Sequence, residues 1–153
     1  MKLLRAPEYQ VRLLPALSST GTPQSEILRA GQATGKVVDG AVLEVMLRWN
    51  DHLLLFLTGD TPFEESLHIH LLNTNLDVID SVWMGHMYSS GVFSDLDLAL
   101  HDAVRFQFFG GTVWTLTLFP EDKFAVPFFS DPMGVHRALK FFRRFKLIST
   151  DLE

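Results

Sequence analysis

The centre of this chain is dominated by short segments in which apolar and polar residues alternate. The pattern runs from Gly40 to Phe119, where leucine, β-branched and aromatic residues are separated by polar ones. A period of two is typical of strands with one buried face. The connections are too short for crossover helices, so we expect the strands to pair antiparallel through hairpins. The predicted strands are residues 41–49, 53–58, 67–72, 76–83, 95–100, 103–109 and 112–119.

This pattern predicts a mainly β fold, an antiparallel meander of about seven or eight strands. The strands can stack as a sandwich or close as a barrel, because both arrangements need one apolar and one polar face. With 153 residues, of which 47% are hydrophobic, the chain fits a single domain, residues 1–153, with a sizeable core. We expect an N-terminal loop and short helix in residues 1–35, the β core in residues 36–129, and a C-terminal helix and tail in residues 130–153.

The N-terminal segment contains a helix signal. Thr22 can cap a helix, Pro23 suits the first helical position, and Gly31 can end the helix. Glu26 would lie near the positive end of that helix, where a carboxylate is favoured. These signals predict one short helix over residues 23–30.

Residues 53–58 differ from the other predicted strands because both alternating sets are apolar. Such a strand should be buried on both faces, so a second element must cover it. The best candidate is the C-terminal segment, where Asp131 and Pro132 form a helix start signal before apolar residues at helical spacing. We therefore expect a helix over residues 132–145, with a strand over residues 141–148 as the alternative.

Register in the last three predicted strands follows from the faces of their side chains. Loops of odd length place apolar residues side by side, with Leu98 opposite Phe106 and Phe106 opposite Leu116. Loops of two residues would instead pair Leu98 with Arg105. We therefore predict the odd-length loops, with polar residues on the other face of these strands.

The C-terminal segment also differs in charge from the rest of the chain. Residues 132–150 carry a net charge of +5 in a chain of net charge −5, which leaves −10 on the remainder. A basic helix can bind an anionic partner, or it can pack by its apolar face and pair its charges internally. We favour internal packing, and nucleic acid is not the expected partner. The binding candidates in this segment are Arg137, Lys140, Arg143 and Arg144.

A second candidate surface is the connection over residues 83–93. It contains Trp83, Met84, Met87 and Tyr88, residue types that are enriched at recognition surfaces. These side chains would line a pocket or a protein interface. The alternative is that they fold back and close one end of the β core.

The most suggestive short motif for chemistry is His68-Ile69-His70. On a strand both imidazoles point to one face, so they can converge on a metal ion. A turn at residues 73–75 would also set His68 opposite Asp80 and give a histidine–carboxylate pair. The alternative is that both histidines are polar positions that alternate with core residues.

Missing residue types and segments exclude several protein classes. The chain has no cysteine, which excludes disulfides, a thiolate nucleophile and cysteine-ligated metal sites. The longest apolar run, Leu53 to Leu57, is far shorter than the roughly 20 residues of a membrane-spanning helix. Polar residues interrupt the N-terminal stretch before it reaches the length of a signal-peptide core. We therefore expect a cytoplasmic protein without a transmembrane segment.

Catalytic and cofactor signatures do not stand out, so the sequence favours binding over catalysis. We expect a non-enzymatic binding or protein-interaction module without a cofactor, with a second copy of the chain or another protein as partner. One alternative is a metal-dependent enzyme built on His68 and His70. The other is a carrier of a small apolar ligand, which needs an internal void that Phe106, Phe108 and Trp114 would fill.

Overall fold

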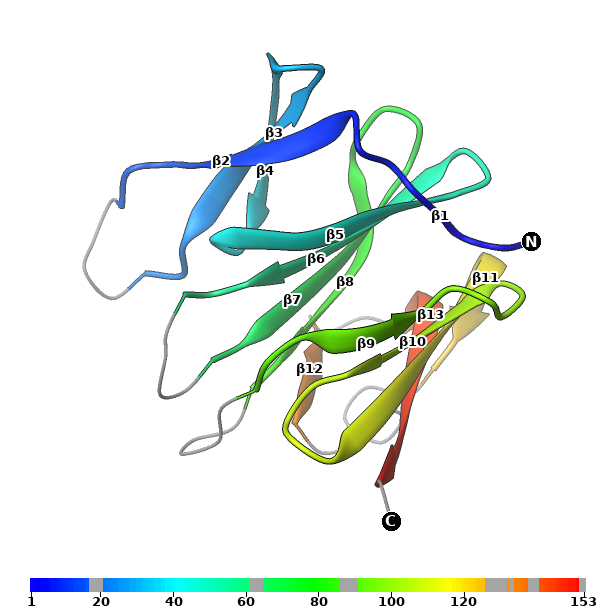
Figure 1. The fold of residues 1–153 in the computed structure, drawn as a ribbon. Coiled ribbons are helices and arrows are strands. Elements are labelled where there is room, and N and C mark those ends of the chain that lie inside the picture. The colour runs from blue at the N-terminus through cyan, green and yellow to red at the C-terminus, as the bar shows by residue number, and fades with distance from the viewer. Residues whose placement is uncertain are drawn as a thin grey trace.

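The computed structural model describes residues 1–16, 21–60, 65–85, 91–125, 132, 134–137 and 141–151, and Figure 1 shows their fold. Over these residues the chain forms 13 strands in three antiparallel sheets. The described residues contain no helix, and therefore none that is long and apolar enough to cross a membrane. The prediction of a mainly β, antiparallel fold is confirmed. The described strands form open, stacked sheets and close no barrel.

The largest sheet has six strands in the order β1-β5-β6-β7-β8-β12 and lies between the other two sheets (Figure 1). Its strands are β1 Leu4–Arg5, β5 Val42–Trp49, β6 His52–Thr58, β7 Leu67–Leu72, β8 Val78–Met84 and β12 Val135–Arg137. The four central strands, β5 to β8, form a meander of hairpins. They match four of the predicted strands closely, and residues 67–72 match exactly in their bounds.

A four-stranded sheet in the order β13-β11-β10-β9 packs on one face of the six-stranded sheet. Its strands are β9 Ser94–Asp97, β10 Ala103–Gln107, β11 Thr112–Phe124 and β13 Phe142–Asp151. The core between these sheets is rich in aromatic and leucine side chains. Phe56 of β6 meets Phe106 of β10 edge to face, with ring centroids 5.2 Å apart.

A three-stranded sheet in the order β2-β3-β4 packs on the other face of the six-stranded sheet. Its strands are β2 Tyr9–Leu13, β3 Gln24–Arg29 and β4 Gln32–Asp39. Ile27 and Val38 of this sheet share a second core with Leu55 and Leu57 of β6. β6 is therefore buried on both faces, as predicted. The N-terminal sheet covers its second face, in place of the predicted C-terminal helix.

The predicted N-terminal helix over residues 23–30 is wrong, because this stretch contains strand β3. Ser25 and Ile27 are buried while their neighbours are more exposed, which is the period of a strand. Ala30 and Gly31 have φ angles of 50° and 78° and turn the chain into β4. The glycine thus serves a hairpin turn, for which positive φ is required, and does not end a helix.

The predicted C-terminal helix over residues 132–145 is also wrong where the structure describes it. β12 and β13 occupy its described parts, and β13 confirms the alternative of a strand over residues 141–148. Phe145 and Leu147 are buried while Lys146 between them is exposed. Pairing with β11 therefore outweighs the helical spacing of the apolar residues in this segment.

The register predicted for the last three strands is wrong by two residues, although the faces are correct. Phe106 lies opposite Trp114, and Arg105 lies opposite Asp97, so neither Phe106–Leu116 nor Leu98–Phe106 is formed. The odd length predicted for this loop is kept, because the five residues 108–112 separate the paired Gln107 and Val113, but the loop is centred one residue earlier than predicted. Moving a loop by one residue shifts the register by two, which keeps each side chain on its face.

Candidate functional site

The candidate interface residues of the 83–93 connection lie on different faces of β8. Trp83 is 46% exposed and stacks on His136 of β12, with ring centroids 4.0 Å apart. Met84 is buried in the core shared with the four-stranded sheet. The alternation of β8 therefore separates the two side chains. Met87 and Tyr88 lie outside the described residues.

The basic candidates of the C-terminal segment make internal contacts where the structure describes them. The Arg137 side chain is 8% exposed, and its guanidinium donates to both carboxylate oxygens of Asp80, at 2.7 Å each. Arg144 donates from its guanidinium to the carbonyl oxygens of Phe119 and Pro120, at 3.1 and 2.9 Å. Arg143 is half-buried on β13, and Lys140 lies outside the described residues. These contacts agree with internal pairing of the basic segment.

Asp80 accepts further hydrogen bonds inside the protein. The backbone N–H groups of Ser81 and Arg144 donate to its carboxylate at 2.9 and 2.8 Å. Its side chain is 1% exposed and faces the four-stranded sheet, because Asp80 lies opposite Leu71 of β7. The predicted pairing of His68 with Asp80 is therefore wrong: His68 lies opposite Trp83, on the other face of the sheet.

His68 and His70 point to the face of β7 opposite the aromatic core, and their rings are stacked with centroids 6.4 Å apart. Both ring nitrogens of His70 are engaged, Nδ1 with the Ser81 hydroxyl and Nε2 with the Asp39 carbonyl oxygen at 2.9 Å. Burial lowers the pKa of His68 to about 4, and burial also lowers the pKa of His70. Both imidazoles are therefore neutral near pH 7. Among the described residues, no group of three or more potential ligands surrounds them.

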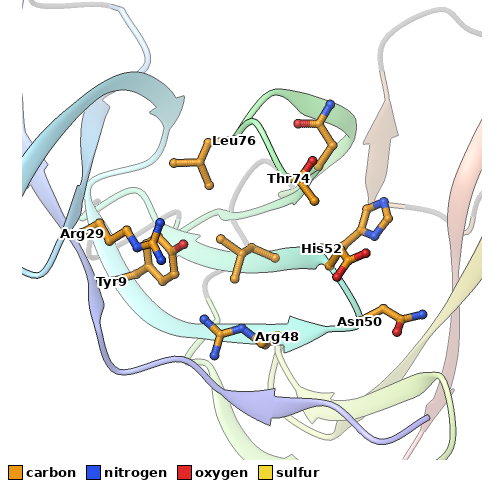
Figure 2. Close-up of a pocket in the computed structure, with 10 residues that line it drawn as sticks. Tyr9, Arg29, Arg48, Asn50, His52, Thr74 and Leu76 are labelled. Carbon is orange, nitrogen blue, oxygen red and sulfur yellow. The ribbon is translucent and has the colours of Figure 1, made fainter.

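A pocket of about 310 Å³ opens where the N-terminal sheet meets one end of the six-stranded sheet (Figure 2). Side chains from strand ends and hairpin turns surround it, and most of them are polar. The lining residues are Tyr9, Arg29, Arg48, Asn50, Asp51, His52, Leu53, Asn73, Thr74 and Leu76. No sequence motif marks any of these residues as part of a binding site.

Two hairpin turns at the same end of the meander build one side of the pocket. Trp49 pairs with His52, so Asn50 and Asp51 form the β5–β6 turn, and Asn50 has a φ of 55°. In the β7–β8 turn, Asn73 Oδ1 accepts the backbone N–H groups of residues 75 and 77 at 2.9 and 3.0 Å. Asparagine suits both positions, because it tolerates positive φ and can bond to the backbone of its own turn.

The N-terminal sheet supplies the opposite side of the pocket. Tyr9 and Arg29 lie opposite each other on β2 and β3, and Figure 2 shows their side chains next to each other. The guanidinium carbon of Arg29 lies 5.7 Å from the centroid of the Tyr9 ring, a cation–π distance. The Arg48 guanidinium donates to the Glu8 carboxylate. This contact holds the pKa of Glu8 below its ordinary value and raises the pKa of Arg48, so both groups are charged.

His52 stands at the edge of the pocket next to the ring of Trp49, with centroids 5.6 Å apart. Burial lowers the pKa of His52, and the nearby positive charge of Arg144 lowers it further. Its Nδ1 is buried and has no hydrogen-bond partner among the described residues. The imidazole is therefore neutral near pH 7, and the charges around the pocket come from arginine and carboxylate groups.

In comparisons with known proteins, no family model, curated protein or solved structure matches this chain. The chemistry of the pocket therefore has to be inferred from its own residues. Guanidinium, amide and hydroxyl groups from four separate segments converge on a space of small-molecule size, which is an arrangement suited to binding.

Proposed function

We propose that this protein is a non-enzymatic binding module whose ligand site is the pocket between the N-terminal sheet and the six-stranded sheet. The observation that carries the proposal is the convergence of polar side chains from two sheets and two turns on one hollow of about 310 Å³. This volume is at the lower end of the range for ligand pockets, which fits a small polar molecule. Leu53 and Leu76 add an apolar contact to the polar lining.

Most polar groups of the lining, apart from Asp51 and His52, are suited to recognition rather than to proton transfer. Arginine keeps its charge at physiological pH, and asparagine and threonine do not titrate there, so these groups bind and orient molecules without exchanging protons. The alternative of a metal-dependent enzyme at His68 and His70 receives less support. Both nitrogens of His70 already make hydrogen bonds, and a metal ion would have to replace one of them. An apolar carrier is also disfavoured, because large side chains fill the core where such a ligand would lie.

A pocket-filling substitution tests the proposal. Thr74 lines the pocket and is exposed, so Thr74→Trp should fill it without disturbing a core. Thr150→Trp is the matched control, because Thr150 is exposed on β13 of the four-stranded sheet. Small polar molecules are screened against the full chain by amide NMR.

We expect a hit to shift the backbone amides of the turns at residues 50–51 and 73–77 in the native protein and in Thr150→Trp. The same compound should not shift them in Thr74→Trp. Binding that is equally strong in Thr74→Trp would overturn the proposal, and so would a screen in which these amides never move.

A protein partner is a second candidate, favoured by the exposed stack of Trp83 on His136. Aromatic side chains with this degree of exposure are typical of contact surfaces. Self-association measured by light scattering, with Trp83→Ala as the variant, tests whether a second copy is the partner. A weaker dimer in the variant is the expected result, and an unchanged monomer in both proteins would contradict it.

A cytoplasmic location stays a prediction, which fractionation of the source cells would check.

A further inference from the structure

The charges around the pocket are not balanced evenly across it. Arg48 is paired with Glu8, and Arg29 is close enough to help lower the pKa of Glu8 but forms none of the ion pairs found among the described residues. Among the lining residues, Asp51 is the one with a carboxylate side chain. It belongs to the β5–β6 turn together with Asn50. In Figure 2, Asn50 lies on the side of the pocket away from Arg29. Two guanidinium groups and the single Glu8 carboxylate leave one side of the pocket with a net positive charge, whereas the other side carries Asp51.

Arg29 is exposed, and the Tyr9 ring orients its guanidinium. Its guanidinium lies over the Tyr9 ring, and its backbone pairs with Tyr9 across the two strands. The next residue, Ala30, donates its backbone N–H to the Glu8 carbonyl oxygen at 2.7 Å, which fixes the turn after β3 against the start of β2. A guanidinium that is positioned in this way keeps its planar fork of donors available, and less side-chain entropy is lost when it binds an anion.

We propose that the pocket binds a small molecule bearing a carboxylate or phosphate group, and that Arg29 is the residue that contacts this anion. The inference rests on the proposed function, because it names the class of ligand for the same pocket. Repulsion from Asp51 orients the ligand, so that its anionic group lies at the Tyr9–Arg29 side. We assign contact with its uncharged polar part to the turns at the other side, where Figure 2 places Asn50 and Thr74.

The experiment compares charge-removing substitutions at two arginines of the full chain. Arg29→Gln removes the proposed contact without breaking an ion pair of the described residues. Arg105→Gln is the matched control, because Arg105 is exposed on β10 and bonds to Thr115. Each protein is titrated with inorganic phosphate, with acetate and with glycerol at constant ionic strength. The backbone amides of Arg29 and Thr74 are followed by NMR, and circular dichroism checks the fold of each variant.

We expect phosphate or acetate to shift these amides to saturation, and the stronger of the two identifies the anionic group. Glycerol, which is neutral, should bind more weakly. Arg29→Gln should weaken binding of the anion by about tenfold or more, because a charge-assisted hydrogen bond is lost. Arg105→Gln should leave the affinity for the anion unchanged. Equal binding by Arg29→Gln, or no saturable shift with either anion, would overturn the inference. If a neutral molecule still binds at the pocket and is blocked by Thr74→Trp, the proposed function survives without the anion; if neither class binds, both fail.

Discussion

The two faces of the six-stranded sheet are packed in different ways. Against the four-stranded sheet, Phe56, Phe106 and Trp114 fill a core in which the Asp80–Arg137 pair is the buried ionic contact. Against the N-terminal sheet, the core is smaller, includes the neutral histidines of β7 at its margin, and opens into the pocket. A closely packed face stabilises the fold, and a less completely filled face leaves room for a ligand. We infer that stability and binding are divided between the two faces.

The largest effect is expected from a cavity in the aromatic core. Phe106→Ala removes a fully buried ring that contacts Phe56, so it should lower the free energy of unfolding by about 3–5 kcal/mol. Urea denaturation measures the loss, and Val92→Ala, at a residue that is 78% exposed, is the control with little change. A loss well below about 1 kcal/mol for Phe106→Ala would contradict the assignment of this face as the stabilising one.

Breaking the buried ion pair should cost nearly as much. Asp80→Ala leaves the Arg137 guanidinium buried without its carboxylate, which typically costs about 3–5 kcal/mol. Replacing both residues with leucine should recover part of this loss, since no unpaired charge is then buried. Chemical denaturation of the two variants gives the comparison. A double variant that is less stable than Asp80→Ala would show that the pair has another role.

The connection between β4 and β5 offers a test with a smaller, local effect on stability. Gly40 joins β4 to β5 with a φ of 127°, and a Cβ at this residue would clash with the Cβ of Leu57. Gly40→Ala should therefore destabilise the protein by about 2–3 kcal/mol through strain and overpacking. Gly110→Ala is the control, because a Cβ there meets no atom within 4 Å. Equal melting temperatures for the two variants would contradict the close approach at Gly40.

The histidines of the second face predict a dependence of stability on pH. The pKa of His68 is lowered from 6.5 to about 4, so between these values the unfolded chain binds a proton that the folded protein does not. Stability should therefore be complete above pH 6.5 and fall as the pH decreases toward 4, by about 3 kcal/mol if His68 alone contributes. His68→Gln should reduce this slope in denaturation measured across that range. An unchanged slope would mean that His68 is not buried in its neutral form.

The sequence predicted those elements whose pattern is complete within a few residues. The double apolar alternation of residues 53–58 correctly indicated a strand buried on both faces, and residues 67–72 were bounded correctly. The sequence-based prediction was wrong where one local pattern fits both a helix and a strand. Thr22-Pro23 resembles a helix start, but the alternation of Ser25 and Ile27 against the second core decides for a strand. Helix propensity is weak beside such tertiary packing.

The pocket could not be predicted from motifs because its residues come from distant parts of the chain. Tyr9 and Thr74 have no spacing that links them, and only the stacking of two sheets brings them to one place. One feature of the sequence could have indicated where the pocket lies. The turns at residues 50–51 and 73–77 are separated by one intervening hairpin connection, so a meander places them at the same end of the sheet. Asparagine in both turns marked that end as polar.

Mapping amide hydrogen exchange with and without the bound anion tests the division between the two faces most directly. With saturating phosphate or acetate, whichever binds more strongly, we predict slower exchange at Arg29 and in the turns at residues 50–51 and 73–77, and no change in β10 and β11. The same pattern should be absent in Arg29→Gln. Protection confined to β10 and β11, or to the Trp83 surface, would contradict the assignment of ligand binding to the N-terminal face.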